Sequence, residues 1–335
     1  MTYKTETENF KNYIDKWVDR YSVYVPSESG ELVLYEQDRE IAWHKVPVWG
    51  GIKDFVFPAR NRVVGDDSHP AAEEKPVMLI GVRGCDLVAL TKVLDKIFLQ
   101  QEPVDTVYKK LRENLTLVSV DCREPAETCF CSAVGGSPYG MKGYDINLSF
   151  LSSEQVLVDA GSEKGEKLVE ELSPGKAKKE ELAKRDDLKD TAVWKIKNNF
   201  ERDYKKDNFR QKIEENKDEK YWTQKAQDCM ICGGCNFACP TCYCNLLDEV
   251  SDRKEIKKVL QWDGCQFKGY ARVGGGANPR LEKWERLRYR YLCKFRIMDE
   301  EFEIPGCTGC GRCIIVCPAN IDIREIIEGV LAGGC

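Results

Sequence analysis

The sequence has little histidine, no long apolar run and no excess of positive charge. Only two of its 335 residues are histidines, His44 and His69, so sites built from several imidazoles are largely excluded. No stretch approaches the roughly 20 apolar residues that a membrane-spanning helix needs. The formal net charge is -5 and the hydrophobic share is 42%. We therefore expect a globular protein with no nucleic-acid partner and no direct membrane insertion.

Several common catalytic and nucleotide-binding motifs are also missing. The chain has no G-x-x-x-x-G-K-[ST] phosphate loop, no G-x-S-x-G nucleophile motif and no G-x-G-x-x-G between a strand and a helix. It opens MTYKTETENFKNY, without the basic and apolar regions of a secretory signal. These absences predict a cytoplasmic protein whose chemistry does not use a phosphate loop or a serine nucleophile.

Cysteine, by contrast, is abundant. The count of 17 is odd, which disfavours a secreted disulfide scaffold and favours thiols that bind metal in a reducing compartment. Thirteen of the 17 fall within residues 227–335. This last part of the chain is therefore predicted to be a metal-binding domain.

Composition and periodicity divide the chain into three parts and predict an α+β protein. Residues 1–160 hold short β-rich runs and helical patterns, as expected of a mixed α/β domain with cysteine-bearing loops. Residues 161–226 interleave Lys, Glu, Asp and Arg, which predicts a charged helical connector with a solvated surface. Residues 227–335 are expected to form a helical two-cluster ferredoxin-like domain.

Two apolar runs in the N-terminal part predict neighbouring buried strands. Val77–Val82 precedes an apolar stripe at helical spacing in residues 86–99, so Gly84 and Cys85 lie at a predicted strand-to-helix turn. Leu115–Val120 leads into a second loop that carries further cysteines. We therefore expect two cysteine-bearing loops to leave the ends of two strands.

The pattern C-x2-C-x2-C-x3-C-P occurs twice in the C-terminal part. It is the spacing of bacterial two-cluster ferredoxins, in which three closely spaced thiolates bind one cluster and the fourth binds the other. Zinc bound by C-x2-C pairs is the alternative, but zinc ribbons usually keep two such pairs well apart. The spacing predicts two [4Fe-4S] clusters, the first held by Cys229, Cys232, Cys235 and Cys317 and the second by Cys239, Cys307, Cys310 and Cys313.

A second group of cysteines lies in the N-terminal part. Cys85 stands in GVRGCDL, and Cys122, Cys129 and Cys131 stand in DCREPAETCFC. A cubane needs four converging thiolates and no strict spacing, so these four thiols predict a third [4Fe-4S] site. A zinc site or free buried cysteines are the alternatives.

Five cysteines remain outside these sets: Cys242, Cys244, Cys265, Cys293 and Cys335. We expect buried or idle thiols here, because a free cysteine behaves as a small hydrophobe. A further site formed by the first three is the alternative.

Taken together, these motifs resemble one family of iron–sulfur proteins. The segments GVRGCDLVAL, CREPAETCFC, CxxCGGCNFACPTCYC, WDGC and CTGCGRCIIVCPANIDI are similar to the iron–sulfur electron-transfer component of anaerobic sulfite reductase and to the beta subunit of soluble sulfhydrogenases. The resemblance spans essentially the whole chain, including KDFVFP at Lys53–Pro58. The family usually has proline where Gly84 stands and histidine where Cys293 stands.

The resemblance implies an electron-transfer subunit that need not catalyse a reaction itself. Its implied partners are a flavoprotein subunit that binds FAD and NAD(P)H, and that can carry a [2Fe-2S] cluster, and a terminal catalytic subunit of the sulfite reductase, hydrogenase or heterodisulfide reductase type. Cubane clusters exchange single electrons, and a flavin splits the electron pair of a hydride. The alternatives are a flavin- or nucleotide-binding reductase acting on its own substrate and a cysteine-rich zinc interaction module.

Overall fold

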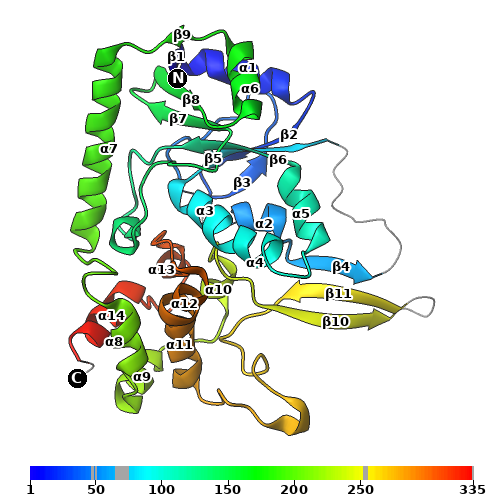
Figure 1. Ribbon diagram of the computed structural model, residues 1–335, viewed down its shortest axis with the longest axis vertical. Coiled ribbons are helices and arrows are strands. Elements are labelled where there is room, and N and C mark those ends of the chain that lie inside the picture. The colour runs from blue at the N-terminus through cyan, green and yellow to red at the C-terminus, as the bar shows by residue number, and fades with distance from the viewer. Residues whose placement is uncertain (47–48, 50, 65–74, 252–255, 334–335) are drawn as a thin grey trace.

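The computed structural model describes most of the chain, as residues 1–46, 49, 51–64, 75–251 and 256–333 (Figure 1). Of the residues named above, His69 and Cys335 lie outside the described residues. Within the described part, no helix is both long enough and apolar enough to cross a membrane.

The N-terminal half is built on an eight-stranded mixed sheet with the order β3-β2-β5-β6-β7-β8-β1-β9. Neighbouring strands from β2 to β7 pair in parallel, and the outer pairs are antiparallel. Every residue of β5 and β6 is buried, as expected for strands covered on both faces. The strands are β1 Thr2–Glu6, β2 Ser22–Pro26, β3 Leu32–Leu34, β5 Val77–Val82, β6 Leu115–Val120, β7 Ile146–Phe150, β8 Gln155–Ala160 and β9 Gly175–Lys176.

Helices cover both faces of this sheet (Figure 1). Met78 and Ile80 of β5 pack in one core with α1 and α6, whereas Leu79 packs in another core with α3 and α5. This division follows from the alternation of side chains along a strand. The helices are α1 Thr7–Trp17, α2 Ile52–Val56, α3 Gly84–Val88, which continues through the π-helical η1 Ala89–Leu94 into α4 Asp95–Leu99, then α5 Thr106–Glu113 and α6 Glu163–Leu172.

The charged segment after β8 is helical, as its composition predicts. After α6 and the short strand β9, the long helix α7 Lys179–Asn199 runs down one side of the molecule toward the C-terminal helices (Figure 1). Two shorter helices complete it, α8 Phe209–Glu215 and α9 Glu219–Ala226. The α+β class is therefore confirmed.

A second sheet joins the two halves of the chain and was not anticipated. The hairpin of β10 Asn245–Ser251 and β11 Ile256–Trp262 pairs, through β11, with β4 Arg60–Val64 from the N-terminal half. The indole N–H of Trp262 also donates to the carbonyl of Phe57 at 3.0 Å. The C-terminal part thus contains strands as well as the expected helices.

The C-terminal helices enclose the cysteine motifs around a core of their own. Phe130, which comes from a loop of the N-terminal half, is buried in this core beside Trp222 and Phe295. The remaining elements are the 3-10 segments η2 Cys131–Val134 and η3 Gly274–Gly276, the helices α10 Gly234–Phe237 and α11 Lys283–Leu292, the π-helical η4 Cys293–Ile297, and α12 Met298–Phe302, α13 Arg312–Ile315 and α14 Ile323–Leu331.

Candidate metal centres

The first ferredoxin motif surrounds a cavity together with the last cysteine of the second motif, and we call this site 1. Four thiols line it, beside Arg290 and Tyr291: Cys229, Cys232, Cys235 and Cys317. Short turns bring the first three together, because Gly233 takes up the left-handed conformation with φ of 73° just before α10. The backbone N–H of Ile321 donates to Cys317 Sγ at 3.3 Å.

The second motif surrounds a neighbouring cavity, site 2, together with the last cysteine of the first motif. Its thiols are those of Cys239, Cys307, Cys310 and Cys313. The backbone N–H of Gly309 points at Cys307 Sγ at 3.5 Å. Burial raises the pKa of the Cys307 thiol to about 12, so this thiol stays protonated unless a positive charge compensates its thiolate.

Two buried cations lie where they can provide such compensation. Arg290 is 5% exposed, lines both cavities and donates to the carbonyl of Cys235 at 3.0 Å. Lys294 is 3% exposed and lines site 2. In the part of the chain that the structure describes, neither forms an ion pair with a carboxylate. Thiolates ligating a metal cluster are the anions that fit these charges.

The four cysteines of the N-terminal half also come together, at what we call site 3. Cys85 begins α3 and Cys122 follows β6, so both stand at the ends of adjacent parallel strands. Cys129 and Cys131 are buried in the loop after Cys122. Burial, then the nearby thiols of Cys122 and Cys310, raise the pKa of Cys129 to about 12. Electrostatic interactions link Cys85 to Cys122, and Cys122 to Cys131.

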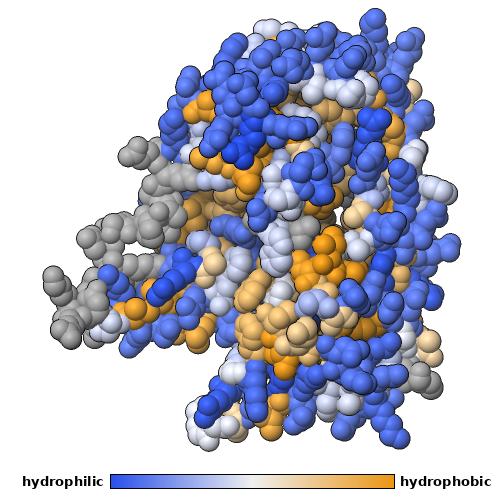
Figure 2. All heavy atoms as spheres, turned by 180° about the vertical axis from the view of Figure 1, so that it is seen from behind, coloured by the Kyte–Doolittle hydropathy of each residue, from blue (hydrophilic) through white to orange (hydrophobic). Residues whose placement is uncertain are grey.

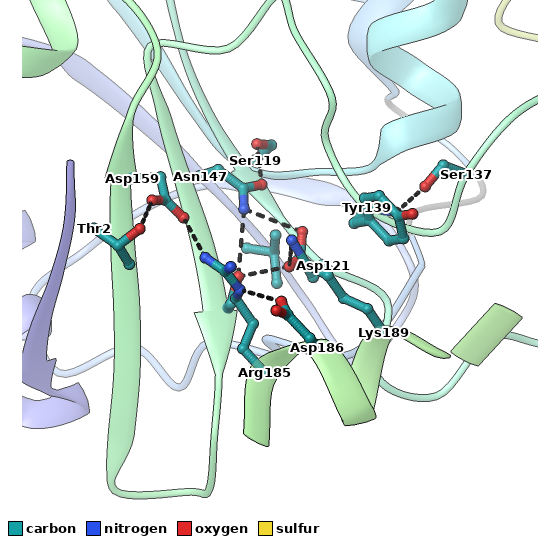
Figure 3. Close-up of polar contacts among 12 residues, drawn as sticks. Thr2, Ser119, Asp121, Ser137, Tyr139, Asn147, Asp159, Arg185, Asp186 and Lys189 are labelled. Atoms are coloured by element: carbon teal, nitrogen blue, oxygen red, sulfur yellow. Dashed lines mark hydrogen bonds and ion pairs between the residues drawn. The ribbon is translucent and has the colours of Figure 1, made fainter. Parts of the chain in front are cut away.

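A polar network holds the strand end that carries Cys122 (Figure 3). The carboxylate of the preceding residue, Asp121, accepts hydrogen bonds from Asn147 Nδ2 at 3.1 Å and Ser149 Oγ at 2.6 Å. Lys189 of α7 forms an ion pair with it at 3.4 Å. The network connects β6, β7 and α7, and so fixes the start of the loop that carries the site 3 cysteines.

Close backbone packing at Gly84 positions Cys85. A Cβ atom at this position would come within 2.6 Å of the carbonyl oxygens of Ser137 and Tyr139. Only glycine allows this approach, which brings the loop after β6 against the N-terminus of α3.

Site 3 lies directly against site 2. The backbone N–H of Phe130 donates to the carbonyl of Gly309 at 2.8 Å, and Cys129 Sγ lies 3.8 Å from the carbonyl oxygen of Cys310. Gly309 has φ of 63°, and a Cβ atom there would lie 2.5 Å from Cys131 Cα. The loops of the two sites are therefore in van der Waals contact.

The structure also contains a cavity that no sequence motif predicted. It has a volume of about 400 Å³ and lies between the two halves, lined by Trp49, Lys53, Asp54, Phe237, Cys239 and Trp262 among others. Lys53 lies 3.8 Å from the centre of the Trp262 ring and donates to the carbonyl of Phe237 at 2.9 Å. The only earlier signal was KDFVFP, which supplies Lys53 and Asp54.

The arrangement of the thiols favours clusters over single metal ions. Among the described residues, no three Cys, His, Asp or Glu side chains are placed to hold one ion, as tetrahedral zinc requires. At sites 1 and 2 the thiols instead surround cavities that also contain buried cations. Four thiolates around each cavity match the donor set of a [4Fe-4S] cluster.

Comparison with known proteins identifies the class of protein that this arrangement defines. Residues 228–321 match the family model of the 4Fe-4S dicluster domain, so the chain is an iron–sulfur protein. It is 32% identical over 339 residues to sulfhydrogenase 2 subunit beta of Pyrococcus furiosus, with 98% of each chain covered. The chain belongs to the sulfhydrogenase beta subunit family, which confirms the resemblance seen in its motifs. No solved structure matches it.

Proposed function

We propose that the chain is an electron-relay subunit of a cytoplasmic oxidoreductase complex. It would pass single electrons between a flavoprotein subunit that binds FAD and NAD(P)H and a catalytic subunit of the hydrogenase, sulfite reductase or heterodisulfide reductase type. When bound, [4Fe-4S] clusters supply one-electron chemistry, and the flavin of the partner splits the hydride pair. The name of the Pyrococcus furiosus relative designates a subunit, which supports a role within a complex.

The observation that carries this proposal is the contiguity of the three thiol sets. Sites 1 and 2 share Arg290 and Cys313 in their walls, and the loops of sites 2 and 3 are hydrogen-bonded through Phe130 and Gly309. Electron tunnelling slows steeply with distance, so adjoining centres suit a relay. We propose that each set binds one [4Fe-4S] cluster through its four cysteines.

The exposure of site 1 supports its role as one end of the relay. Cys232 is exposed, and two apolar side chains of the same motifs, Met230 and Ile315, are 68% and 47% exposed. Figure 2 shows hydrophobic residues gathered across the middle of one face of the molecule. Exposed apolar surface of this kind marks sites where partners dock.

The cavity between the two halves supports a second candidate, a reductase that binds flavin or a nucleotide itself. Its aromatic side chains and Lys53 are of the kind that contact a planar, anionic cofactor, and Cys239 of site 2 lines the same cavity. In that case the isolated chain would retain flavin on purification.

The test compares the isolated chain with the assembled complex. The flavin-free chain should oxidise neither NADH nor NADPH with an artificial acceptor, and should gain this activity when the flavoprotein partner is added. In the complex, Cys129→Ala should slow electron delivery to the catalytic subunit and leave reduction of the flavin by NAD(P)H intact. Oxidation of NAD(P)H by the isolated chain would contradict the relay, and undiminished delivery in the variant would place site 3 off the path.

A further inference from the structure

Four cysteines outside the three sites also gather in the structure. Cys244 and Cys265 are brought together by the hairpin β10–β11, whose register pairs Asn245 with Trp262, and their thiols are hydrogen-bonded. Cys293, at the end of α11, interacts electrostatically with both Cys244 and Cys265. Residues separated by about fifty positions in the sequence therefore meet beside site 2.

The fourth thiol, Cys242, is tied to this group by Asn236. The side-chain amide nitrogen of Asn236 contacts Cys265 Sγ at 3.3 Å and Cys242 Sγ at 3.8 Å. Cys242 is also hydrogen-bonded to Cys239, a predicted ligand at site 2. The four thiols thus surround a region that adjoins site 2.

Buried polar groups direct N–H and O–H donors at these sulfurs. Asn236 and Gln266 are 1% and 3% exposed, and Gln266 Nε2 lies 3.7 Å from Cys265 Sγ. Arg290 Nη1 lies 3.8 Å from Cys242 Sγ, and the hydroxyl of Tyr270 is hydrogen-bonded to Cys244. A neutral thiol is a weak acceptor, so burying several donors against thiols would be unfavourable. Sulfur that carries negative charge makes the same arrangement favourable.

The nearby positive charges are consistent with such sulfur. Lys53 is 3% exposed, and the thiols closest to it electrostatically are those of Cys242 and Cys239. Lys294 interacts in the same way with Cys239, Cys242 and Cys293. With Arg290, three buried cations thus surround site 2 and this group, which exceeds what one set of ligands would ordinarily gather.

We propose that Cys242, Cys244, Cys265 and Cys293 bind a fourth iron–sulfur cluster, beside site 2. Each thiol would release its proton to solvent as its sulfur ligates iron supplied, with sulfide, during cluster assembly. A cluster suits the four thiols better than one zinc ion, because no three ligating side chains in the described residues are placed for a single metal. The proposal concerns the chain's own metal content and stands apart from the direction or partners of the relay.

The test is the metal content of the full-length chain. The wild type and the double variant Cys244→Ser/Cys265→Ser are purified without oxygen and reconstituted with Fe²⁺ and sulfide. The double variant should lose about two to four iron and as many sulfide per chain, the content of a two-iron or a four-iron cluster, together with one electron paramagnetic resonance signal. Cys335→Ser, which removes a cysteine assigned to no site, should change neither.

Three results would overturn the proposal: an unchanged iron content in the double variant, one equivalent of zinc that only the wild type holds, or a Cys244–Cys265 disulfide in iron-replete protein. Tyr270→Phe covers the case in which the double variant does not fold. It keeps all four thiols, so iron should be unchanged while the reduction potential of one signal falls, since a hydrogen bond to its ligand is lost. Unchanged potentials for every signal would also contradict the fourth cluster, whereas a failed relay would leave all these values as they are.

Discussion

Asp86 and Arg312 form a buried bidentate ion pair between the two halves of the chain, with Arg312 Nη1 and Nη2 donating to the carboxylate oxygens at 2.5 and 2.9 Å. Asp86 follows Cys85 of site 3, and Arg312 stands between Cys310 and Cys313 of site 2. One ion pair thus fixes the spacing of two proposed clusters. The residues nearest the metal sites also hold the halves together.

Asp86→Asn should therefore destabilise the protein strongly. Removing one partner of a buried pair leaves the other charge uncompensated, which typically costs about 3–5 kcal/mol. The matched control is Glu113→Gln, which breaks the exposed pair of Lys109 and Glu113 and should change the free energy of unfolding by less than about 1 kcal/mol. Urea unfolding of both variants measures the difference, and equal effects would contradict a structural role for Asp86.

Cys317→Ser should disturb the cluster at site 1, although Cys317 lies in the second motif. Its thiol lines the cavity with Cys229, Cys232 and Cys235, so its loss removes one of four ligands there. Cys313→Ser, four residues earlier, should instead disturb site 2. Electron paramagnetic resonance of the reduced variants separates the two signals. The proposed exchange of ligands would be wrong if both variants altered the same signal.

Lys294→Met should make the cluster at site 2 harder to reduce. The ammonium group is buried and donates to Thr241 Oγ1 at 2.6 Å, and the side chain lines the cavity with Cys239 and Cys307. Losing a positive charge disfavours the added electron, so the reduction potential should fall. Lys258→Met, at a side chain 47% exposed, should leave every potential unchanged. A redox titration followed by electron paramagnetic resonance measures both.

Asp54 should make stability depend on pH. Burial raises the pKa of its carboxyl to about 6 against the opposing effects of Lys53 and Arg312. Between about pH 4 and pH 6 the folded chain holds a proton that the unfolded chain has released, so the contribution of Asp54 to stability is lost as pH rises through this window. Asp54→Asn should remove that loss and be more stable than the wild type at pH 7. Urea unfolding at pH 5 and pH 7 tests this, and parallel pH dependences would contradict it.

Much of the fold was predictable because local patterns carried it. The apolar runs at Val77–Val82 and Leu115–Val120 predicted buried strands, and both are central strands of the sheet. The alternating charges after residue 160 predicted helices, and α6 to α9 follow. The hairpin β10–β11 was missed because its strands, as in NLLDEVS, lack the alternation of a half-buried strand. Pairing with β4, far away in the sequence, completes that sheet.

The sequence by itself determined which residues are available for metal binding and which family the chain belongs to, because ligand spacing within a short loop is a local property. Only the tertiary structure decided how the loops meet. The contact of Gly309 with Cys131, the ion pair of Asp86 with Arg312 and the meeting of Cys265 with Cys293 all join distant segments. Such contacts depend on the packing of whole elements, since no local pattern of residues encodes the distance between two loops.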